Sequence, residues 1–257
     1  MTYRFSLTEA DILAEALDTR IRLFPFQLPG SSALLDQRFR IAGQVTTALR
    51  ERGLIRRAGL LPDIARCFRL LSDYRVAIAM LGTVEHTREL YARVSGNRQE
   101  GVLAIKDGET MSLRLIPPEG LVRAAVGLLP SMTAGPGHSV TVTEPASEPR
   151  QSEDDEDYVF FRQKPLPDAN SQAGLRAAEE ILRRPRLGAG YFVVSHRDRT
   201  GTETTAPGLN WIDTDAGRYL VRTGHRGDGG RLATYTPADD TRLARQLDEL
   251  VSTTGII

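Results

Sequence analysis

The sequence predicts an α+β fold in which helices flank a central antiparallel β-sheet, arranged as two similar halves. In each half, apolar residues first recur every three or four positions, as in helices, and then every second position, as in strands. The segments between strand candidates are shorter than the crossovers that parallel neighbours need. Each half ends with a strand, a proline and a helix, at Pro117 and at Pro237.

The first half opens with helices. Residues 3–7 alternate as a strand does, and Ser6 with Glu9 forms a capping box for a helix that follows. A second helix is predicted over residues 32–52, with Gly53 as its C-terminal cap, and Pro62 opens a third. On the second helix, the positions expected to face inward are Leu35, Phe39, Ala42, Thr46 and Leu49. On the third they are Ile64, Cys67, Phe68 and Leu71.

Strands follow these helices. Alternation is visible over residues 76–80, 90–94 and 111–115. Asp107 and Gly108 are predicted to form a two-residue turn between strands 101–106 and 109–116, since glycine tolerates the positive φ that such turns require. Pro117 and Pro118 then end the sheet and begin a helix.

Residues 131–157 differ from the rest in composition. They are rich in Pro, Ser, Thr and Gly and end in the acidic run 153–157. Such a stretch buries little apolar surface, so we expect a flexible acidic linker that joins the halves 1–130 and 158–257 within one domain. A partner-binding acidic segment is the alternative interpretation.

The second half repeats the scheme. A helix is predicted over residues 170–184, and a last helix opens at Pro237. The strands predicted between them are Tyr191–His196, Leu209–Asp213, Arg218–Thr223 and Arg231–Thr236.

Composition narrows the range of functions that the chain can have. The chain has 33 basic and 33 acidic residues, without the basic surplus typical of a general nucleic-acid binder. Its one cysteine, Cys67, lies in an apolar helical row, which favours a buried structural thiol. No apolar run approaches the ~20 residues needed to insert into a membrane, and no signal-peptide core is present, so we expect a cytosolic protein.

No set of residues with catalytic or ligand-binding spacing emerges. The four histidines are scattered, so we expect no metal site, no cofactor and no catalytic residue. Gly188-Ala189-Gly190 lacks the third glycine of a dinucleotide fingerprint and reads as a helix-to-strand connection. Two alternatives remain open at this point. One is a hydrolase-like enzyme with a cleft between the halves that uses Asp198 and Asp213, and the other is a nucleic-acid-binding regulatory module that uses Arg183, Arg184 and Arg186.

The second half carries a recognisable succession of short motifs. They are Gly188–Val194, Arg197–Gly201, Leu209–Thr214, Gly217–Leu220 and Thr236–Asp239. In order and spacing they resemble the EspG family of ESX (type VII) secretion-associated proteins. The first half is similar in its helix from Thr8, in Arg52-Gly53-Leu54 and in the hairpin through Asp107. The resemblance runs over essentially the whole chain, and the arginine-rich composition fits an actinobacterial source.

The resemblance implies a cytosolic, non-enzymatic chaperone with a pseudo-two-fold fold. Such a protein binds the tip of the PPE subunit of a PE–PPE heterodimer, keeps the pair soluble and directs it to the matching ESX export system. Four residues carry the resemblance to the family: Trp211, Asp213, Arg218 and Tyr219. We expect all four to stabilise the fold and Asp213 to fix a turn.

We expect two loops at the end of the sheet, residues 82–87 and 95–100, to contact the partner. Val84, an apolar residue between polar neighbours, suits a contact rim. The predicted partner-binding residues are Gly82, Thr83, Val84, Glu85, His86, Arg98 and Gln99. The alternative is that both segments are ordinary solvated hairpin loops.

Overall fold

Two compact units make up the chain in the computed structural model, which describes residues 1–26, 28, 35–144, 172–225 and 230–253. Unit 1 consists of Met1–Leu81, Glu89–Leu128 and Ser195–Thr204. Unit 2 consists of Gly82–Arg88, Leu129–Val194 and Thr205–Ile257. Each unit thus includes a short segment from the other half of the chain, which the sequence did not predict.

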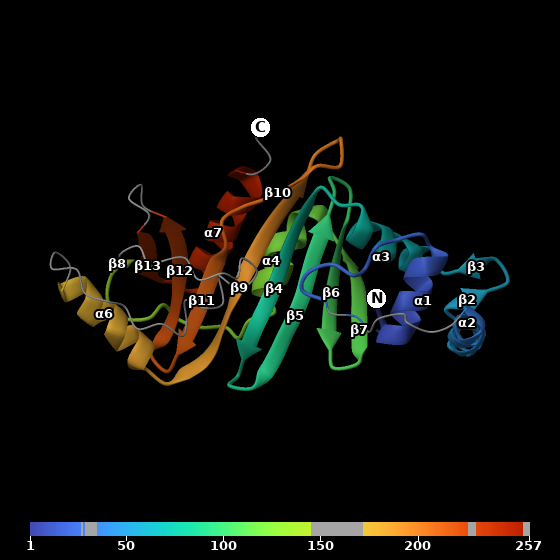
Figure 1. Cartoon of the computed structure of the whole chain (residues 1–257), viewed down its shortest axis with the longest axis horizontal. Helices are drawn as coiled ribbons and strands as arrows, with labels where there is room; N and C mark the ends of the chain where they lie inside the picture. The colour runs from blue at the N-terminus through green and yellow to red at the C-terminus, as the bar shows by residue number, and fades with distance from the viewer. Residues whose placement is uncertain (27, 29–34, 145–171, 226–229, 254–257) are drawn as a thin grey trace. The chain divides into compact units, whose positions relative to one another are not determined.

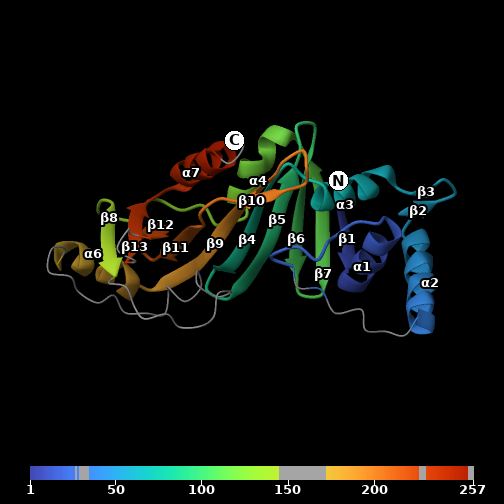
Figure 2. The same cartoon turned by 45° about the horizontal axis from the view of Figure 1, so that its top comes forward.

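The strands of unit 1 form an antiparallel sheet in the order β1-β7-β6-β5-β4 (Figures 1 and 2; β1 is labelled in Figure 2). Their bounds are β1 Thr2–Ser6, β4 Val76–Val84, β5 Arg88–Gly96, β6 Gly101–Asp107 and β7 Thr110–Ile116. The first strand of the chain therefore pairs with the last strand of a β4–β7 meander.

Helices pack on this sheet around an apolar core. Their bounds are α1 Leu7–Ala16, α2 Leu35–Glu51, α3 Pro62–Ser72, the 3₁₀ turn η1 Pro118–Gly120 and α4 Leu121–Val126. A small hairpin of β2 (Ile55–Arg56) and β3 (Gly59–Leu60) follows α2. The core joins Phe5 of β1 and Leu13 of α1 to Phe68 of α3 and Met111 of β7. In both views of unit 1, α2 lies farther from the sheet than α1 (Figures 1 and 2).

Several predictions for unit 1 are confirmed in detail. Ser6 and Glu9 form the capping box, with Glu9 N donating to Ser6 Oγ at 3.1 Å and Ser6 N donating to Glu9 Oε2 at 2.8 Å. Gly53, after α2, has the left-handed φ of 69° that a glycine cap supplies. Pro62 opens α3, and the Cys67 side chain is completely buried.

Two predictions for unit 1 are wrong. Phe39 was expected to face inward, but it is 74% exposed, because the buried face of α2 is centred on Val45 and Leu49. The β6–β7 turn lies one residue later than predicted: Asp107 pairs with Thr110, so Gly108 (φ 53°) and the residue after it form the turn.

Unit 2 contains a second antiparallel sheet segment in the order β9-β11-β12-β13-β8. Its strands are β8 Val140–Glu144, β9 Arg186–Arg197, β11 Leu209–Thr214, β12 Gly217–His225 and β13 Arg231–Pro237, and β10 (Glu203–Thr205) pairs with β9. Helix α6 (Gln172–Arg183) packs its buried residues Leu175, Ala178 and Ile181 against Ile212 and Tyr235. Helix α7 (Asp240–Thr253) buries Leu243 and Leu247.

The structure corrects the predicted linker. Residues 140–144 form β8, which pairs with β13, and Val142 is buried against α6 in the core of unit 2. Ala134 makes a parallel bridge to Arg218. Residues 131–144 are therefore part of unit 2, since their alternating valines bury apolar surface. The remainder of the predicted linker, residues 145–157, lies outside the described residues.

Two boundaries in unit 2 also differ from prediction. The segment Gly188-Ala189-Gly190 lies within β9 and is not a helix-to-strand connection. Its glycines permit close approach of the β4 backbone, since a Cβ at Gly188 would lie 2.8 Å from Thr83 O. Pro237 ends β13, and α7 begins at Asp240. The Asp239 carboxylate accepts a hydrogen bond from Arg242 N at 2.8 Å and caps that helix.

The two units repeat one topology. In unit 1, β1 precedes helices, the meander β4-β5-β6-β7 and α4, and β1 pairs with β7. In unit 2, β8 precedes α6, the meander β9-β11-β12-β13 and α7, and β8 pairs with β13. The prediction of an α+β fold with antiparallel pairing and two similarly built parts is confirmed.

Candidate partner-binding surface

The first predicted contact segment is the end of β4 and the turn that follows it, within unit 2. Glu85 and His86 form the turn with positive φ angles of 50° and 72°. The turn is fixed from both sides: His86 N donates to Leu187 O at 2.6 Å, and Arg88 Nε lies 2.9 Å from Glu85 Oε2. Left-handed backbone at two successive non-glycine residues costs free energy and is a feature that concentrates at functional sites.

Two of the predicted contact residues in this segment are buried. Val84 is 0% exposed, so its assignment to a contact rim is wrong: as a strand residue, it points into the protein. Gly82 lies against β9, where a Cβ would come within 2.4 Å of Ala189 O and 2.7 Å of Gly190 Cα. Gly82 therefore serves the fold, and the predicted contact residues of this segment that are exposed are Thr83, Glu85 and His86.

The second predicted segment is the turn between β5 and β6, in unit 1. Asn97 organises it, because its Oδ1 accepts hydrogen bonds from Gln99 N at 2.8 Å and from Glu100 N at 3.1 Å. Glu100 pairs in turn with Arg66 of α3. Arg98 and Gln99 are left exposed at the tip.

The structure does not bring the two predicted segments together. They lie at opposite ends of β5, which has 9 residues and so separates them by about 30 Å. They also belong to different units. A single compact interface with a partner can therefore include only one of these two turns.

The four residues with the family appearance are buried, as expected for residues that hold the fold. Trp211 and Arg218 are each 0% exposed, Tyr219 1% and Asp213 2%. Asp213 does not fix the turn, however. It lies opposite Arg218 in the β11–β12 pairing, and the turn is instead fixed by Thr214, whose Oγ1 donates to Gly217 O at 2.8 Å.

Arg218 is the centre of a buried ionic network in unit 2. Its Nε and Nη2 donate to the two carboxylate oxygens of Asp213 at 2.6 and 3.0 Å. Its Nη1 donates to Asp240 Oδ1 at 2.8 Å, and Nη2 also donates to Pro130 O at 2.8 Å. Asp240 further accepts from Ser131 Oγ at 2.7 Å. This network ties β11, β12, the first turn of α7 and residues 130–131 together.

A second buried arginine lies in unit 1 and was not found from the sequence. Arg93 is 4% exposed, and burial lowers its pKa. Its guanidinium stands 4.7 Å from the centroid of the Tyr74 ring, and Nη1 donates to Phe24 O at 2.9 Å. Arg197 lies 4.4 Å from the same ring and pairs with Glu203 at 3.2 Å. Cation–π contacts of this kind leave no spacing signal in a sequence.

The carboxylates of the enzymatic alternative have structural roles. Asp198 Oδ1 accepts hydrogen bonds from Thr200 N at 2.8 Å and Thr202 N at 2.9 Å, so it shapes its own loop. The hydrogen bond from the Thr200 side chain is the main cause of its lowered pKa. Asp213 is neutralised by Arg218. Within the described ranges, no three His, Cys, Asp or Glu side chains are grouped closely enough to hold a metal ion.

The basic residues of the nucleic-acid alternative are interleaved with acids. Arg183 pairs with Glu179 at 3.0 Å, and Arg184 pairs with Glu180 at 3.4 Å and with Asp215 at 3.8 Å. Such pairing offsets the positive charge that phosphate binding requires. Among the helices that the structure describes, none is both long and apolar enough to cross a membrane.

Comparison with known proteins settles the family. A sequence model described as the EspG family matches residues 6–249, nearly the whole chain. The chain belongs to the EspG family. No curated protein matches it. Among solved structures, it is similar to the Mycobacterium tuberculosis type VII secretion system chaperone EspG5, solved in complex with a PE25–PPE41 dimer. The TM-score is 0.63 at 12% identity, over 99% of this chain and 96% of that one, so the EspG fold is shared at very low identity.

Proposed function

We propose that this EspG-family protein is a cytosolic chaperone of type VII secretion that acts by binding and not by catalysis. It binds the PPE subunit of a PE–PPE heterodimer, keeps the pair soluble and directs it to the cognate ESX system. The observation that carries the proposal is the family match over residues 6–249. The similar fold of EspG5, which was solved with a PE25–PPE41 dimer, supports the choice of partner.

Physical chemistry supports a binding role. A helical tip that exposes apolar side chains aggregates unless another protein covers it. Release at the export machinery requires a reversible contact, which favours a partly polar interface. The β4–β5 turn offers such a surface, because Thr83, Glu85 and His86 are exposed around a turn whose backbone is fixed.

Of the two predicted segments, we place the contact at the β4–β5 turn. Two successive left-handed residues are kept there without glycine, whereas the β5–β6 turn has no non-glycine residue with positive φ. A rigid turn also loses little conformational entropy on binding. Arg98 and Gln99 then serve as the matched control, since they are exposed on the next turn of the same meander.

The double substitution Glu85→Asn and His86→Asn tests this placement. Asparagine tolerates left-handed backbone, so the turn and its backbone hydrogen bond to Leu187 O are retained, while both longer side chains and the Glu85–Arg88 ion pair are removed. We expect the affinity for the partner to fall roughly tenfold, as for residues near the centre of an interface. The control, Arg98→Ala with Gln99→Ala, is expected to bind as the unmodified protein does, measured by biolayer interferometry. Loss of binding in the control alone would move the contact to the β5–β6 turn.

Co-expression tests the function itself. The chain carries an affinity tag and is produced with each PE–PPE pair of the same genome, followed by pull-down and size-exclusion chromatography. We expect one pair, or a few related pairs, to co-purify and to remain soluble only when the chaperone is present. A well-folded protein that retains no pair would overturn the proposal.

A further inference from the structure

Residues 195–204, which we call the arm, come from the second half of the chain but belong to unit 1. The arm contains the hairpin between β9 and β10 and lies beside the end of α3 and the start of β4 (Figure 1). Every residue of the arm is polar or glycine. Because burial of apolar surface is the main force that holds most segments in place, the arm depends on hydrogen bonds and charges instead.

Two residues of the arm attach it to the rest of unit 1. Arg197 N donates to Arg75 O at 2.9 Å, and Arg197 Nη1 donates to Ser72 O at 2.6 Å. The Arg197 guanidinium also stands over the buried Tyr74 ring, 4.4 Å from its centroid. Arg197 Nη2 in turn donates to Glu203 Oε2 at 3.2 Å. The arm therefore closes over Tyr74 through polar and cation–π contacts.

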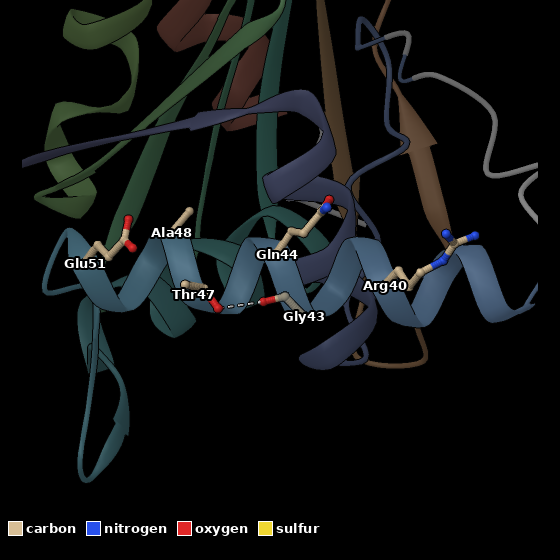
Figure 3. A pocket seen from close by; sticks show the side chains of 6 residues that line it. All are labelled: Arg40, Gly43, Gln44, Thr47, Ala48 and Glu51. Carbon is tan, nitrogen blue, oxygen red and sulfur yellow. Dashed lines mark hydrogen bonds between the residues drawn. The ribbon is translucent and has the colours of Figure 1, made fainter.

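The Tyr74 ring carries a second guanidinium, that of Arg93 on β5, at 4.7 Å from the centroid. An exposed arginine keeps its charge in water, as does Arg40, which lines a shallow hollow of about 610 Å³ along α2 (Figure 3). Arg93 is only 4% exposed, and no ion pair joins it to a carboxylate of the described ranges. A buried charge without a direct partner is costly unless an opposite charge lies nearby.

Glu203 supplies that opposite charge from the arm. Burial lowers the pKa of Arg93, while the Glu203 carboxylate favours its charged form. The same carboxylate pairs directly with Arg197. One carboxylate on the arm therefore serves two arginines that stack on one tyrosine, and the second half of the chain supplies a charge that the first half lacks at this place.

We propose that the arm is a polar latch, in which Glu203 holds Arg93 and Arg197 on Tyr74 and which opens and closes as one unit while the rest of unit 1 stays folded. Segments that bury little apolar surface open locally at a lower free energy than the core around them. Asp198 keeps the shape of the tip, because its Oδ1 accepts hydrogen bonds from two amides of the arm itself. Opening separates Glu203 from Arg93, so the closed state depends on the Glu203 charge.

Hydrogen exchange of the full chain at pH 7, followed by NMR or mass spectrometry, tests the latch. The Arg197 amide reports opening, because its hydrogen bond to Arg75 O joins the arm to the rest of unit 1. We expect it to exchange about a hundredfold or more faster than the core amides of β6, which require a larger unfolding event. Glu203→Gln is expected to accelerate its exchange roughly tenfold further, the effect of losing one charge-assisted hydrogen bond.

Arg199→Gln is the matched control, since Arg199 is exposed on the same arm and makes no ion pair within the described ranges. It is expected to leave the exchange of the Arg197 amide unchanged. Glu203→Asp keeps the charge and is expected to lie closer to the unmodified chain than to Glu203→Gln. In an Arg93→Met background, Glu203→Gln should have a clearly smaller effect, because one of the two charges that it serves is gone.

Three outcomes overturn the proposal. The first is an Arg197 amide that exchanges as slowly as the β6 core. The second is an equal effect of Glu203→Gln and Arg199→Gln, and the third is an equal effect of Glu203→Asp and Glu203→Gln. Circular dichroism establishes that each variant is folded, and the comparison of the three single variants stands without the Arg93→Met background. Partner binding does not enter the measurement.

Discussion

Arg218 shows how one side chain can organise a unit. It is fully buried and makes four charged or carbonyl contacts that join two strands, a helix start and residue 130. Two of its partners are carboxylates, one of them buried as deeply as the arginine itself. Removing the arginine leaves the Asp213 charge buried without compensation, which is far more costly than losing a surface ion pair.

Replacing Arg218 by methionine is therefore expected to lower the free energy of unfolding by about 3–5 kcal/mol. Arg222→Met is the control on the same strand, because Arg222 is exposed and lies 3.9 Å from Glu249; it should change stability by about 0.5 kcal/mol or less. Urea unfolding followed by Trp211 fluorescence measures both. Equal midpoints for the two variants would contradict the structural role of the network.

Cys67 provides a test of burial at the residue scale. Desolvation raises the pKa of its thiol to about 12 from 9.0. Because the thiolate is the reactive form, we expect alkylation by iodoacetamide at pH 8 to be roughly a hundredfold or more slower in the native protein than in denaturant.

The same shift has a consequence for stability. A folded-state pKa above the unfolded value means that the contribution of Cys67 is fully present below pH 9 and declines as the pH rises toward 12. Unfolding midpoints are therefore expected to fall between pH 9 and pH 11, less so in Cys67→Ala than in the unmodified chain. In the alkylation experiment, rapid labelling of Cys67 by iodoacetamide in the native protein at pH 8 would contradict its buried position.

At the scale of elements, close backbone contact explains why glycine occurs inside strands. Gly82→Ala would place a methyl group 2.4 Å from Ala189 O, so β4 and β9 must move apart locally. We expect a loss of about 1–3 kcal/mol, measured by urea unfolding. Gly224→Ala is the matched control, a strand glycine with no atom within 4 Å of the new methyl group. If both substitutions had the same effect, the close approach would not be what requires glycine at position 82.

Sequence patterns predicted helices, turns and caps well where contacts within a few residues determine them. The capping box of Ser6 and Glu9, the glycine cap at position 53 and the strand–proline–helix unit at Pro117 all follow from contacts within a few residues. Strand β8 was missed, because Val140 and Val142 alternate for only a short distance in a polar segment and pair with β13 far along the chain. The glycines of β9 were misread for a similar reason, since their neighbour is the backbone of β4.

The candidate site was predicted less well than the fold. Apolar Val84 between polar neighbours is compatible with an exposed rim and with a strand residue turned inward, and only tertiary structure distinguishes them. The two predicted loops were grouped because both are hairpin turns, although antiparallel strands place successive turns at opposite ends. Phe39 was placed inward by helical spacing alone, yet the other side of α2 faces the core.

At the scale of the whole molecule, each unit has a corresponding strand order, with helical structure between its first strand and its meander and a helix after the meander. A topology repeated twice, with few residues in common, agrees with the weak repeat in the sequence. The EspG family match spans both units, so the proposed function belongs to the chain as a whole and not to one unit.

The most direct test of the central claim is the mass of the complex in solution. The purified chain is mixed with the purified PE–PPE heterodimer that co-expression selects, and the mixture is analysed by size-exclusion chromatography with multi-angle light scattering. We predict one peak whose mass equals one chaperone, one PE and one PPE chain, and no such peak with a heterodimer that belongs to a different ESX system. Separate elution of chaperone and heterodimer at micromolar concentration would contradict the account.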